Sequence, residues 1–178
     1  HPSTDKNLPG IRMASGSLGQ GLSVALGTAE TKKLNNDSSI VYSLHGDGEL
    51  QEGQIWEAAM YAASRGIDNI VATIDYNGRQ IDGDVEDVMS LGNLNQKWQA
   101  FGWEVHEMNG HNFDSIRDTF NKVSSSLGKG KPIVILMKTE MGQGVDFMMG
   151  SHKWHGVAPN EEQLQTALNQ LEETLGDY

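Results

Sequence analysis

Residues 40–53 read Ile-Val-Tyr-Ser-Leu-His-Gly-Asp-Gly-Glu-Leu-Gln-Glu-Gly, and this stretch decides which fold class the sequence favours. Residues 40–44 are mostly apolar or β-branched, which indicates a short β-strand. The polar turn Gly46-Asp47-Gly48 follows, and residues 55–64 are rich in alanine, which favours a helix. A strand, a glycine-rich turn and a helix in this order are typical of α/β proteins.

The same alternation of strands and helices extends to both sides of this stretch. Because the predicted strands are apolar on both faces and alternate with helices, we expect a parallel sheet with helices on both faces. We detect no internal repeat and no linker, so a single α/β domain is predicted over residues 1–178. The further strands are expected at residues 69–75, 103–108 and 132–138, and the helices at 17–34, 94–101, 114–127 and 160–175, the last with Leu164, Leu168, Leu171 and Leu175 on one stripe.

Composition excludes several classes of protein. The chain has 13 Lys and Arg against 24 Asp and Glu, a net charge of −11 at pH 7, so its field repels nucleic acid and anionic membranes. It contains no cysteine, which excludes disulfides and thiolate metal sites. No apolar run approaches the roughly 18–20 residues of a membrane span, and no signal-peptide pattern opens the sequence. We therefore expect a cytoplasmic protein without nucleic-acid or membrane partners.

Asp47 and Asn77 each follow a predicted strand and are thirty residues apart, about one crossover unit. If the two strands are neighbours, the carboxylate and the amide oxygen converge at one edge of the sheet. Mg²⁺ prefers such oxygen ligands and usually takes only one or two protein carboxylates, with phosphate oxygens and water completing its shell. Gly46 and Gly48 would let the backbone approach a diphosphate, beside the start of the next helix. A Gly-Asp-Gly sequence by itself is equally compatible with a plain turn.

Three motifs together resemble those of transketolase. They are Ser-Gly-Ser-Leu-Gly-Gln-Gly-Leu at residues 15–22, Gly-Asp-Gly-Glu-Leu-Gln-Glu-Gly at 46–53 and Gln-Ile-Asp-Gly at 80–83. Trp-His-Gly-Val-Ala-Pro-Asn at 154–160 resembles the N-terminal subunit of split transketolases. The resemblance implies the diphosphate-binding fold of thiamine diphosphate enzymes, with thiamine diphosphate and Mg²⁺ as cofactors.

The resemblance also implies roles for individual residues at the cofactor. The metal ligands would be the side chains of Asp47 and Asn77 and the carbonyl of Arg79, and the N–H of Gly48 would donate to the diphosphate. Ile81 would pack near the cofactor, although burial behind its own loop is an equally good interpretation. The segment that lines the cofactor site would be Gly16, Ser17 and Leu18.

Four further residues are expected near the reacting groups. By resemblance, His1 would lie near the reacting carbon, and either His152 or His155 would lie near the diphosphate and the substrate hydroxyls, with His155 favoured. Glu52 would lie at the subunit contact, in a network with the glutamate that activates the aminopyrimidine. A first-turn glutamate that interacts favourably with the helix dipole is the alternative for Glu52, and both can hold together. Trp56, Trp98 and Trp103 are interpreted as core or interface residues.

The half of the family that contacts the pyrimidine has no match in this sequence. The resemblance therefore implies a pyrimidine-domain, C-terminal partner subunit, which supplies the catalytic glutamate and the phosphate-binding arginines, in a hetero-oligomer built on a dimer. It also implies that a region preceding His1 is missing. The implied activity is transfer of a two-carbon ketol unit from a ketose phosphate to an aldose phosphate. The alternatives are an enzyme like 1-deoxyxylulose-5-phosphate synthase or dihydroxyacetone synthase, and a truncated relic without catalysis.

The alanine-rich helix predicted at residues 55–64 suggests where a partner could dock. Ala58, Ala59, Ala62 and Ala63 are small enough to let another helix approach closely. We expect this face to contribute to the subunit interface, beside Trp56.

Overall fold

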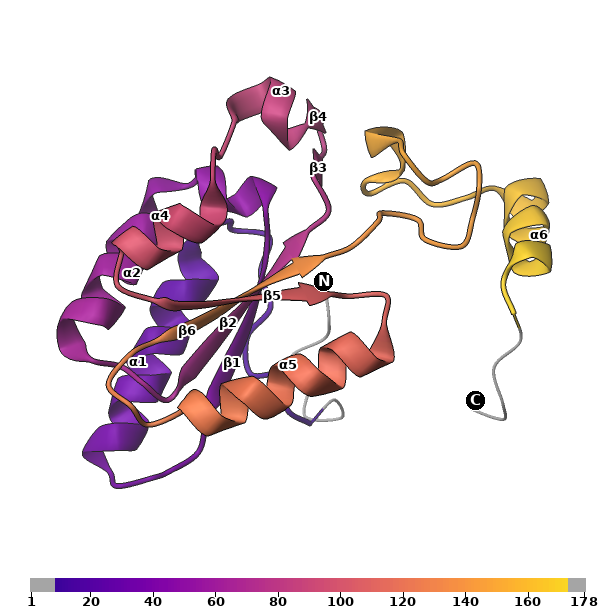
Figure 1. The fold of residues 1–178 in the computed structure, drawn as a ribbon. Helices are drawn as coiled ribbons and strands as arrows, with labels where there is room; N and C mark the ends of the chain where they lie inside the picture. Colours follow the sequence, from indigo (N-terminus) through magenta and orange to yellow (C-terminus); the bar gives the residue numbers. More distant parts are fainter. Residues whose placement is uncertain (1–8, 173–178) are drawn as a thin grey trace.

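Four parallel strands form the central sheet, in the order β1-β2-β6-β5 (Figure 1). The computed structural model describes residues 9–172. In the register of the sheet, Gly46 pairs with Asp75 and Asp75 pairs with Met137, so β1, β2 and β6 end side by side. The strands before Asp47 and Asn77 are therefore neighbours, which is the condition under which the two residues were expected to converge. The strands are β1 (Val41–Gly46), β2 (Ile70–Tyr76), β5 (Glu104–Asn109) and β6 (Ile133–Lys138).

Helices cover both faces of the sheet, as predicted. On one face, Ile70, Ala72 and Ile74 of β2 pack against α1, α2 and α4, while Val71 on the other face joins the cluster beneath α5. A two-strand hairpin and α3 follow β2, and the sequence patterns did not predict them. The helices are α1 (Gln20–Leu34), α2 (Gly53–Arg65), α3 (Val85–Met89), α4 (Leu94–Ala100), α5 (Phe113–Ser126) and α6 (Glu161–Gln170), with 3-10 turns η1 (Gly48–Gln51) and η2 (His152–Trp154) and hairpin strands β3 (Arg79–Gln80) and β4 (Gly83–Asp84).

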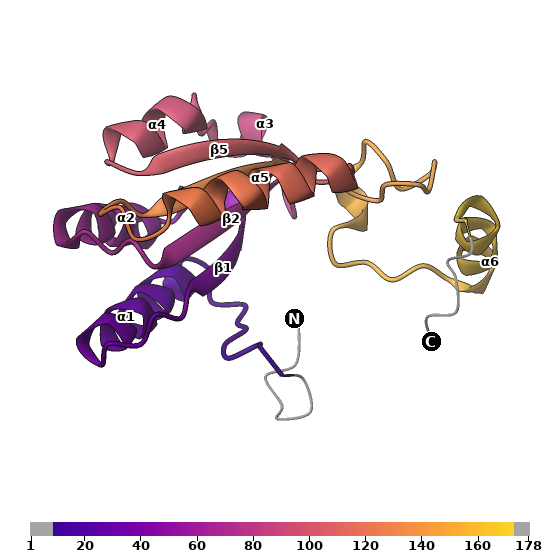
Figure 2. The same cartoon turned by 60° about the horizontal axis from the view of Figure 1, so that its bottom comes forward.

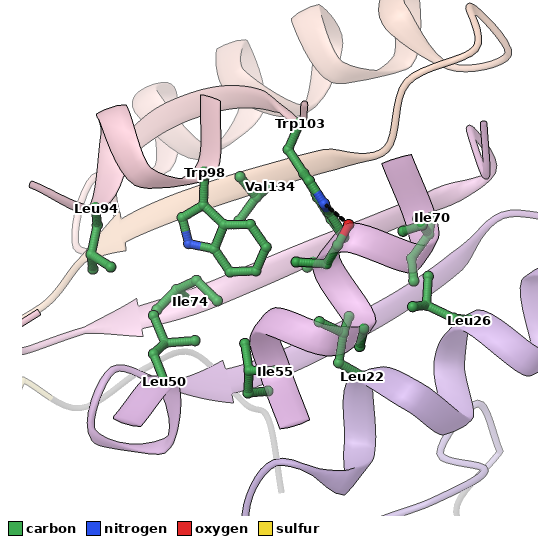
Figure 3. Packing of buried hydrophobic residues seen from close by; sticks show 14 of the residues in the cluster. Leu22, Leu26, Leu50, Ile55, Ile70, Ile74, Leu94, Trp98, Trp103 and Val134 are labelled. Carbon is green, nitrogen blue, oxygen red and sulfur yellow. Dashed lines mark hydrogen bonds between the residues drawn. The ribbon is translucent and has the colours of Figure 1, made fainter. Parts of the chain in front are cut away.

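Tryptophans fill the centre of the larger core (Figure 3). Trp98 is completely buried, and its ring meets Trp103 edge-on with centroids 4.9 Å apart. The indole N–H of Trp103 donates to the carbonyl of Ala59 at 3.0 Å, which fastens the segment after α4 to α2. Trp56 is partly buried against the same cluster. The interpretation of these tryptophans as core residues is confirmed.

The alanine face of α2 serves this chain itself, so its expected role at a subunit interface is wrong. Ala58, Ala59 and Ala62 are at most 5 % exposed and lie in the core cluster shared with α1. Small side chains allow α1 and α2 to lie close together over one face of the sheet. The pattern correctly indicated a close helix neighbour, and that neighbour lies within the chain.

α6 differs from the expected closing helix. It ends at Gln170, where Leu171 adopts an extended backbone, and Leu175 lies outside the described residues. Its axis stands apart from the sheet at the end of a long segment that leaves β6 (Figures 1 and 2). The stripe of Leu164, Leu168 and Leu171 is 38–54 % exposed rather than packed on the sheet. Among residues 9–172, no helix is both long and apolar enough to cross a membrane.

Trp98→Ala should destabilise the fold strongly, because it removes a fully buried aromatic side chain and leaves a cavity. We expect a loss of about 3–5 kcal/mol in the free energy of unfolding, measured by urea denaturation. Phe113→Ala is the matched control, since Phe113 is 89 % exposed and should change stability by less than about 0.5 kcal/mol. Equal losses in the two variants would contradict this assignment of the core.

Candidate metal and cofactor site

Asp47 lies immediately after β1, and its side chain is buried where β1 and β2 end. One carboxylate oxygen, Oδ1, accepts from the N–H of Gly48 at 2.8 Å, and Oδ2 accepts from the N–H of Gly78 at 2.5 Å. The N–H of Asp47 donates to the carbonyl of Asp75 at 3.2 Å. Asp47 therefore connects the end of its own strand to the loop that follows the neighbouring strand.

Asn77 occupies that neighbouring loop in a tightly hydrogen-bonded turn. Its side-chain oxygen accepts from the N–H of Arg79 at 2.8 Å, and its Nδ2 donates to Oδ2 of Asp75 at 3.0 Å. Gly78 has a φ of 74°, a left-handed conformation that glycine adopts without strain. The structure thus brings Asp47 into contact with the residue between Asn77 and Arg79, which are the other two predicted metal ligands.

The charges around Asp47 are unbalanced within the described part of the chain. Burial raises the pKa of Asp47 above its usual value and the nearby Asp75 adds to this, while the hydrogen bonds from Gly78 and Gly48 act in the opposite direction. Among residues 9–172, no Lys, Arg or His forms an ion pair with Asp47 or Asp75. The Arg79 guanidinium instead pairs with Asp84 across the hairpin.

The residues present fit a hard divalent cation. Asp47 and Asn77 offer a carboxylate and an amide oxygen, and a cation at this point would offset two neighbouring carboxylates. Residues 9–172 contain no group of three His, Cys, Asp or Glu side chains that could hold a metal, so a metal here would need the mixed set of oxygens. Glycine at position 48 lets the hairpin residue Gln80 pack closely, because a Cβ at Gly48 would lie 3.0 Å from the Cβ of Gln80. The oxygen Oε1 of Gln80 is buried there without a hydrogen-bond partner.

Glu49 holds the segment before α1 against the end of β1. Its Oε1 accepts from the N–H of Gly19 at 2.9 Å and lies 3.3 Å from Nδ1 of His45, while Oε2 accepts from the N–H of Gly46 at 3.3 Å. Burial raises the pKa of Glu49, but His45 and the two N–H groups outweigh it and leave this pKa below its usual value. Sequence reasoning did not assign Glu49 a role, although it lies inside the motif that was singled out.

The remaining residues predicted at the cofactor lie in two exposed segments, one before α1 and one at the tip of the β3–β4 hairpin. Gly16, Ser17 and Leu18 are exposed and directly precede Gly19, so Glu49 anchors their segment. α1 begins at Gln20 rather than at residue 17, because Gly19 adopts a left-handed φ of 82°. Ile81 is 68 % exposed at the tip of the β3–β4 hairpin, so its alternative interpretation, burial behind the loop, is wrong.

Glu52 and the predicted histidines have different surroundings. Glu52 is the N-cap residue of α2, exposed and without a capping hydrogen bond, and its Cβ lies where a side chain at Gly19 would collide with it. His152 is the first residue of η2 and His155 directly follows it, and η2 lies beside β4 of the hairpin. His152 is partly buried and His155 is exposed. His1 lies outside the described residues.

Two hollows lie over the carboxyl ends of the strands on the side away from Asp47. One of about 210 Å³ includes Tyr76, Asn93 and Lys138 in its lining, and one of about 350 Å³ includes His111 and Thr139. Neither has Asp47 or Asn77 in its lining. Asp47 is buried at this edge of the sheet, whereas Asn77 and Arg79 in the neighbouring loop are partly buried.

A parallel central sheet with helices on both faces and polar loops at its carboxyl edge defines an open α/β protein, a class in which ligands generally bind at that edge. The model of the family described as "Transketolase, thiamine diphosphate binding domain" matches residues 1–175. The chain therefore belongs to this family, and its fold is the α/β thiamine diphosphate-binding fold.

Curated relatives include subunits of two-part transketolases. The chain is 41 % identical over 175 residues to a subunit of the apulose-4-phosphate transketolase of Phocaeicola vulgatus, covering 98 % of this chain and 61 % of the relative. It is 42 % identical over 163 residues to the 6-deoxy-6-sulfo-D-fructose transketolase subunit SqwG of a Clostridium species, covering 92 % of this chain and 58 % of the relative. The chain thus spans about 60 % of the length of these relatives.

Solved structures agree with the fold. The crystal structure of transketolase from Campylobacter jejuni matches with a TM-score of 0.81 and 35 % identity, covering 90 % of this chain and 26 % of that chain. Transketolase from Leishmania mexicana matches with a TM-score of 0.73 and 26 % identity, covering 82 % of this chain and 23 % of that chain.

Glu49→Gln should loosen the junction between α1 and β1. The side-chain NH₂ of glutamine cannot accept a hydrogen bond, so one of the backbone N–H groups that now donate to Glu49 would lose its acceptor. This loss should cost about 1–2 kcal/mol of unfolding free energy. The measurement is urea denaturation. Glu57→Gln, at an exposed position of α2, is the matched control and should leave the transition unchanged. Identical transitions for Glu49→Gln and the unmodified chain would refute the anchoring role.

Proposed function

We propose that this chain binds the diphosphate and Mg²⁺ of thiamine diphosphate as one half of a two-subunit transketolase. The enzyme would move a two-carbon ketol unit from a ketose phosphate to an aldose phosphate. The observation that carries the proposal is the buried carboxylate of Asp47, which has no cationic partner among residues 9–172 and contacts the loop of Asn77 and Arg79. A divalent cation with a diphosphate would balance that charge with the ligands Mg²⁺ prefers.

The side chains of Asp47 and Asn77 and the carbonyl of Arg79 would hold Mg²⁺. Gly46, beside which a Cβ would meet nothing within 4 Å, would let the diphosphate approach the backbone, and Gly48 would offer its N–H. Gly16, Ser17, Leu18 and Ile81 would line the cofactor. When bound, thiamine diphosphate supplies an electron sink for cleavage and formation of the carbon–carbon bond. The work of this chain is to position that cofactor and to balance the charge of its diphosphate.

Histidines and Glu52 would act at the edge of the site. His152, at the start of η2, or His155, just after it, would donate to the diphosphate or to substrate hydroxyls, and His1 would lie near the reacting carbon. Imidazoles suit this task because they can donate or accept protons near neutral pH. Glu52, exposed at the start of α2, would reach the partner subunit.

The relatives that are named as transketolase subunits support a second chain that completes the enzyme. We infer that this partner is a pyrimidine-domain subunit that supplies the activating glutamate and the binding of the sugar phosphate. The assembly would be a hetero-oligomer built on a dimer, in the cytoplasm, and this chain would be inactive alone. Relatives are named for different ketoses, so sugar phosphates are proposed here only as a class. No observation favours the synthase-like alternatives or a relic.

Asp47→Asn and Asn77→Ala should each weaken Mg²⁺-dependent binding of thiamine diphosphate about tenfold or more, because the first replaces a charged carboxylate by a neutral amide and the second removes the amide oxygen. The chain is co-expressed with its pyrimidine-domain partner, and binding is measured by isothermal titration calorimetry with Mg²⁺ and with EDTA. Ketol transfer from a pentulose phosphate is assayed on the same samples and should disappear with EDTA.

Asp87→Asn is the matched control, since it removes one negative charge at an exposed position of α3 and should bind like the unmodified assembly. Cofactor binding that is the same in EDTA, or unchanged in Asp47→Asn, would show that the metal assignment is wrong. An assembly that binds no cofactor would indicate a relic.

A further inference from the structure

Asp75 and Thr139 are polar residues at the ends of β2 and β6 that have no role in the function proposed above. Asp75 is the penultimate residue of β2, and Thr139 directly follows β6. The two strands are paired in parallel, with Asp75 opposite Met137, so both side chains lie at the edge of the sheet that carries Asp47. Their contacts form a chain that ends on Asn77.

The contacts of Asn77 fix which way its amide faces. The N–H of Arg79 can only donate, and it donates to Oδ1 of Asn77. The carboxylate of Asp75 can only accept, and it accepts from Nδ2 of Asn77. Turning the amide over would place two N–H groups against each other and the amide oxygen against a carboxylate. Both neighbours therefore select the same orientation.

Thr139 fixes Asp75 in turn, and both branches of its side chain take part. Its hydroxyl donates to Oδ1 of Asp75, the carboxylate oxygen that does not contact Asn77. Its methyl group packs against Gly110, where a Cβ would lie only 2.6 Å from the methyl carbon. Gly110 itself is held by its N–H, which donates to the carbonyl of Lys138 at 2.8 Å. The hydroxyl of Thr139 is thus aimed by the packing of β5 and β6.

We propose that Asp75 and Thr139 are positioning residues that orient the amide of Asn77, so that its oxygen is presented to the cation of the cofactor. The inference rests on the proposed function and deepens it, because it names what holds a metal ligand in place. Hydrogen-bond partners that orient metal ligands typically change metal affinity 10–100-fold when they are removed. Asp75 and Thr139 also connect the loop that contains Asn77 to β6 and, through Gly110, to the end of β5.

The test uses the assembly of this chain with its pyrimidine-domain partner and Mn²⁺ as a spectroscopic substitute for Mg²⁺. Free Mn²⁺ is measured by electron paramagnetic resonance during titration with saturating thiamine diphosphate, which reports cation binding without any assay of activity. Thr139→Val keeps the shape and loses the hydroxyl, whereas Thr139→Ser keeps the hydroxyl and loses the methyl group. Asp75→Ala removes the carboxylate itself.

We expect Asp75→Ala to raise the Kd for Mn²⁺ about tenfold, at the lower end of what such orienting partners contribute. Thr139→Val should raise it less, about threefold, because Thr139 acts on Asn77 only through Asp75. Thr139→Ser should stay within about twofold of the unmodified assembly, since the orienting hydroxyl is retained. At saturating Mn²⁺, kcat of Thr139→Val should return to the unmodified value, because the pair affects how the cation is held and not the chemistry. Unfolding by urea checks that each variant is folded.

The outcomes separate this inference from the proposed function. If Asp47→Asn loses Mn²⁺ while Thr139→Val and Asp75→Ala bind as well as the unmodified assembly, the positioning role is refuted and the metal site stands. If Asp75→Ala weakens binding but Thr139→Val does not, Asp75 acts through its charge or as a ligand, and the inference is again refuted. If the unmodified assembly does not bind Mn²⁺ with the cofactor, the proposed function itself fails.

Discussion

The site depends on one buried carboxylate held between two neighbouring strands. Burying an ionised group costs free energy unless hydrogen bonds or an opposite charge compensate it. The carboxylate of Asp47 accepts hydrogen bonds from two backbone N–H groups, one in its own turn and one in the loop after β2. The bond from Gly78 joins the ends of β1 and β2, and both bonds leave a negative charge that a cation could balance. The parallel register makes this possible, because it places Gly46 opposite Asp75.

Around this carboxylate, three loops are connected by side chains that accept backbone N–H groups. Glu49 brings the segment before α1 to the end of β1, and Asn77 shapes the turn before the hairpin. Asp75 and Thr139 extend the network to β6. Most of these acceptors are carboxylates, and their donors are mainly main-chain amides of glycine. An acidic protein can thereby shape a site for a cofactor diphosphate without a cluster of lysines or arginines.

Much of the fold was predictable because apolar strands and periodic helices are local patterns. The four strands and the buried tryptophans followed from such patterns. The convergence of Asp47 with the loop of Asn77 also required β1 and β2 to be neighbours, which spacing alone does not decide. The alanine face of α2 was misassigned because small residues indicate a close helix but not which helix. Ile81 was not distinguishable as buried or exposed, since its place at a hairpin tip depends on the pairing of β3 with β4. The leucine stripe near the C-terminal end indicated a helix correctly, but not whether that helix would pack on the sheet.

By itself, the sequence determined the fold class, the order of elements and the residues around the predicted metal site, because these depend on side-chain chemistry and on spacing along the chain. Only the tertiary structure decided which strand ends lie side by side and which partners each polar side chain finds. Asp75 and Thr139 are 64 residues apart, and no local pattern relates them. Their contact arises because β6 pairs with β2 in the middle of the sheet, and strand order is set by the packing of the whole chain.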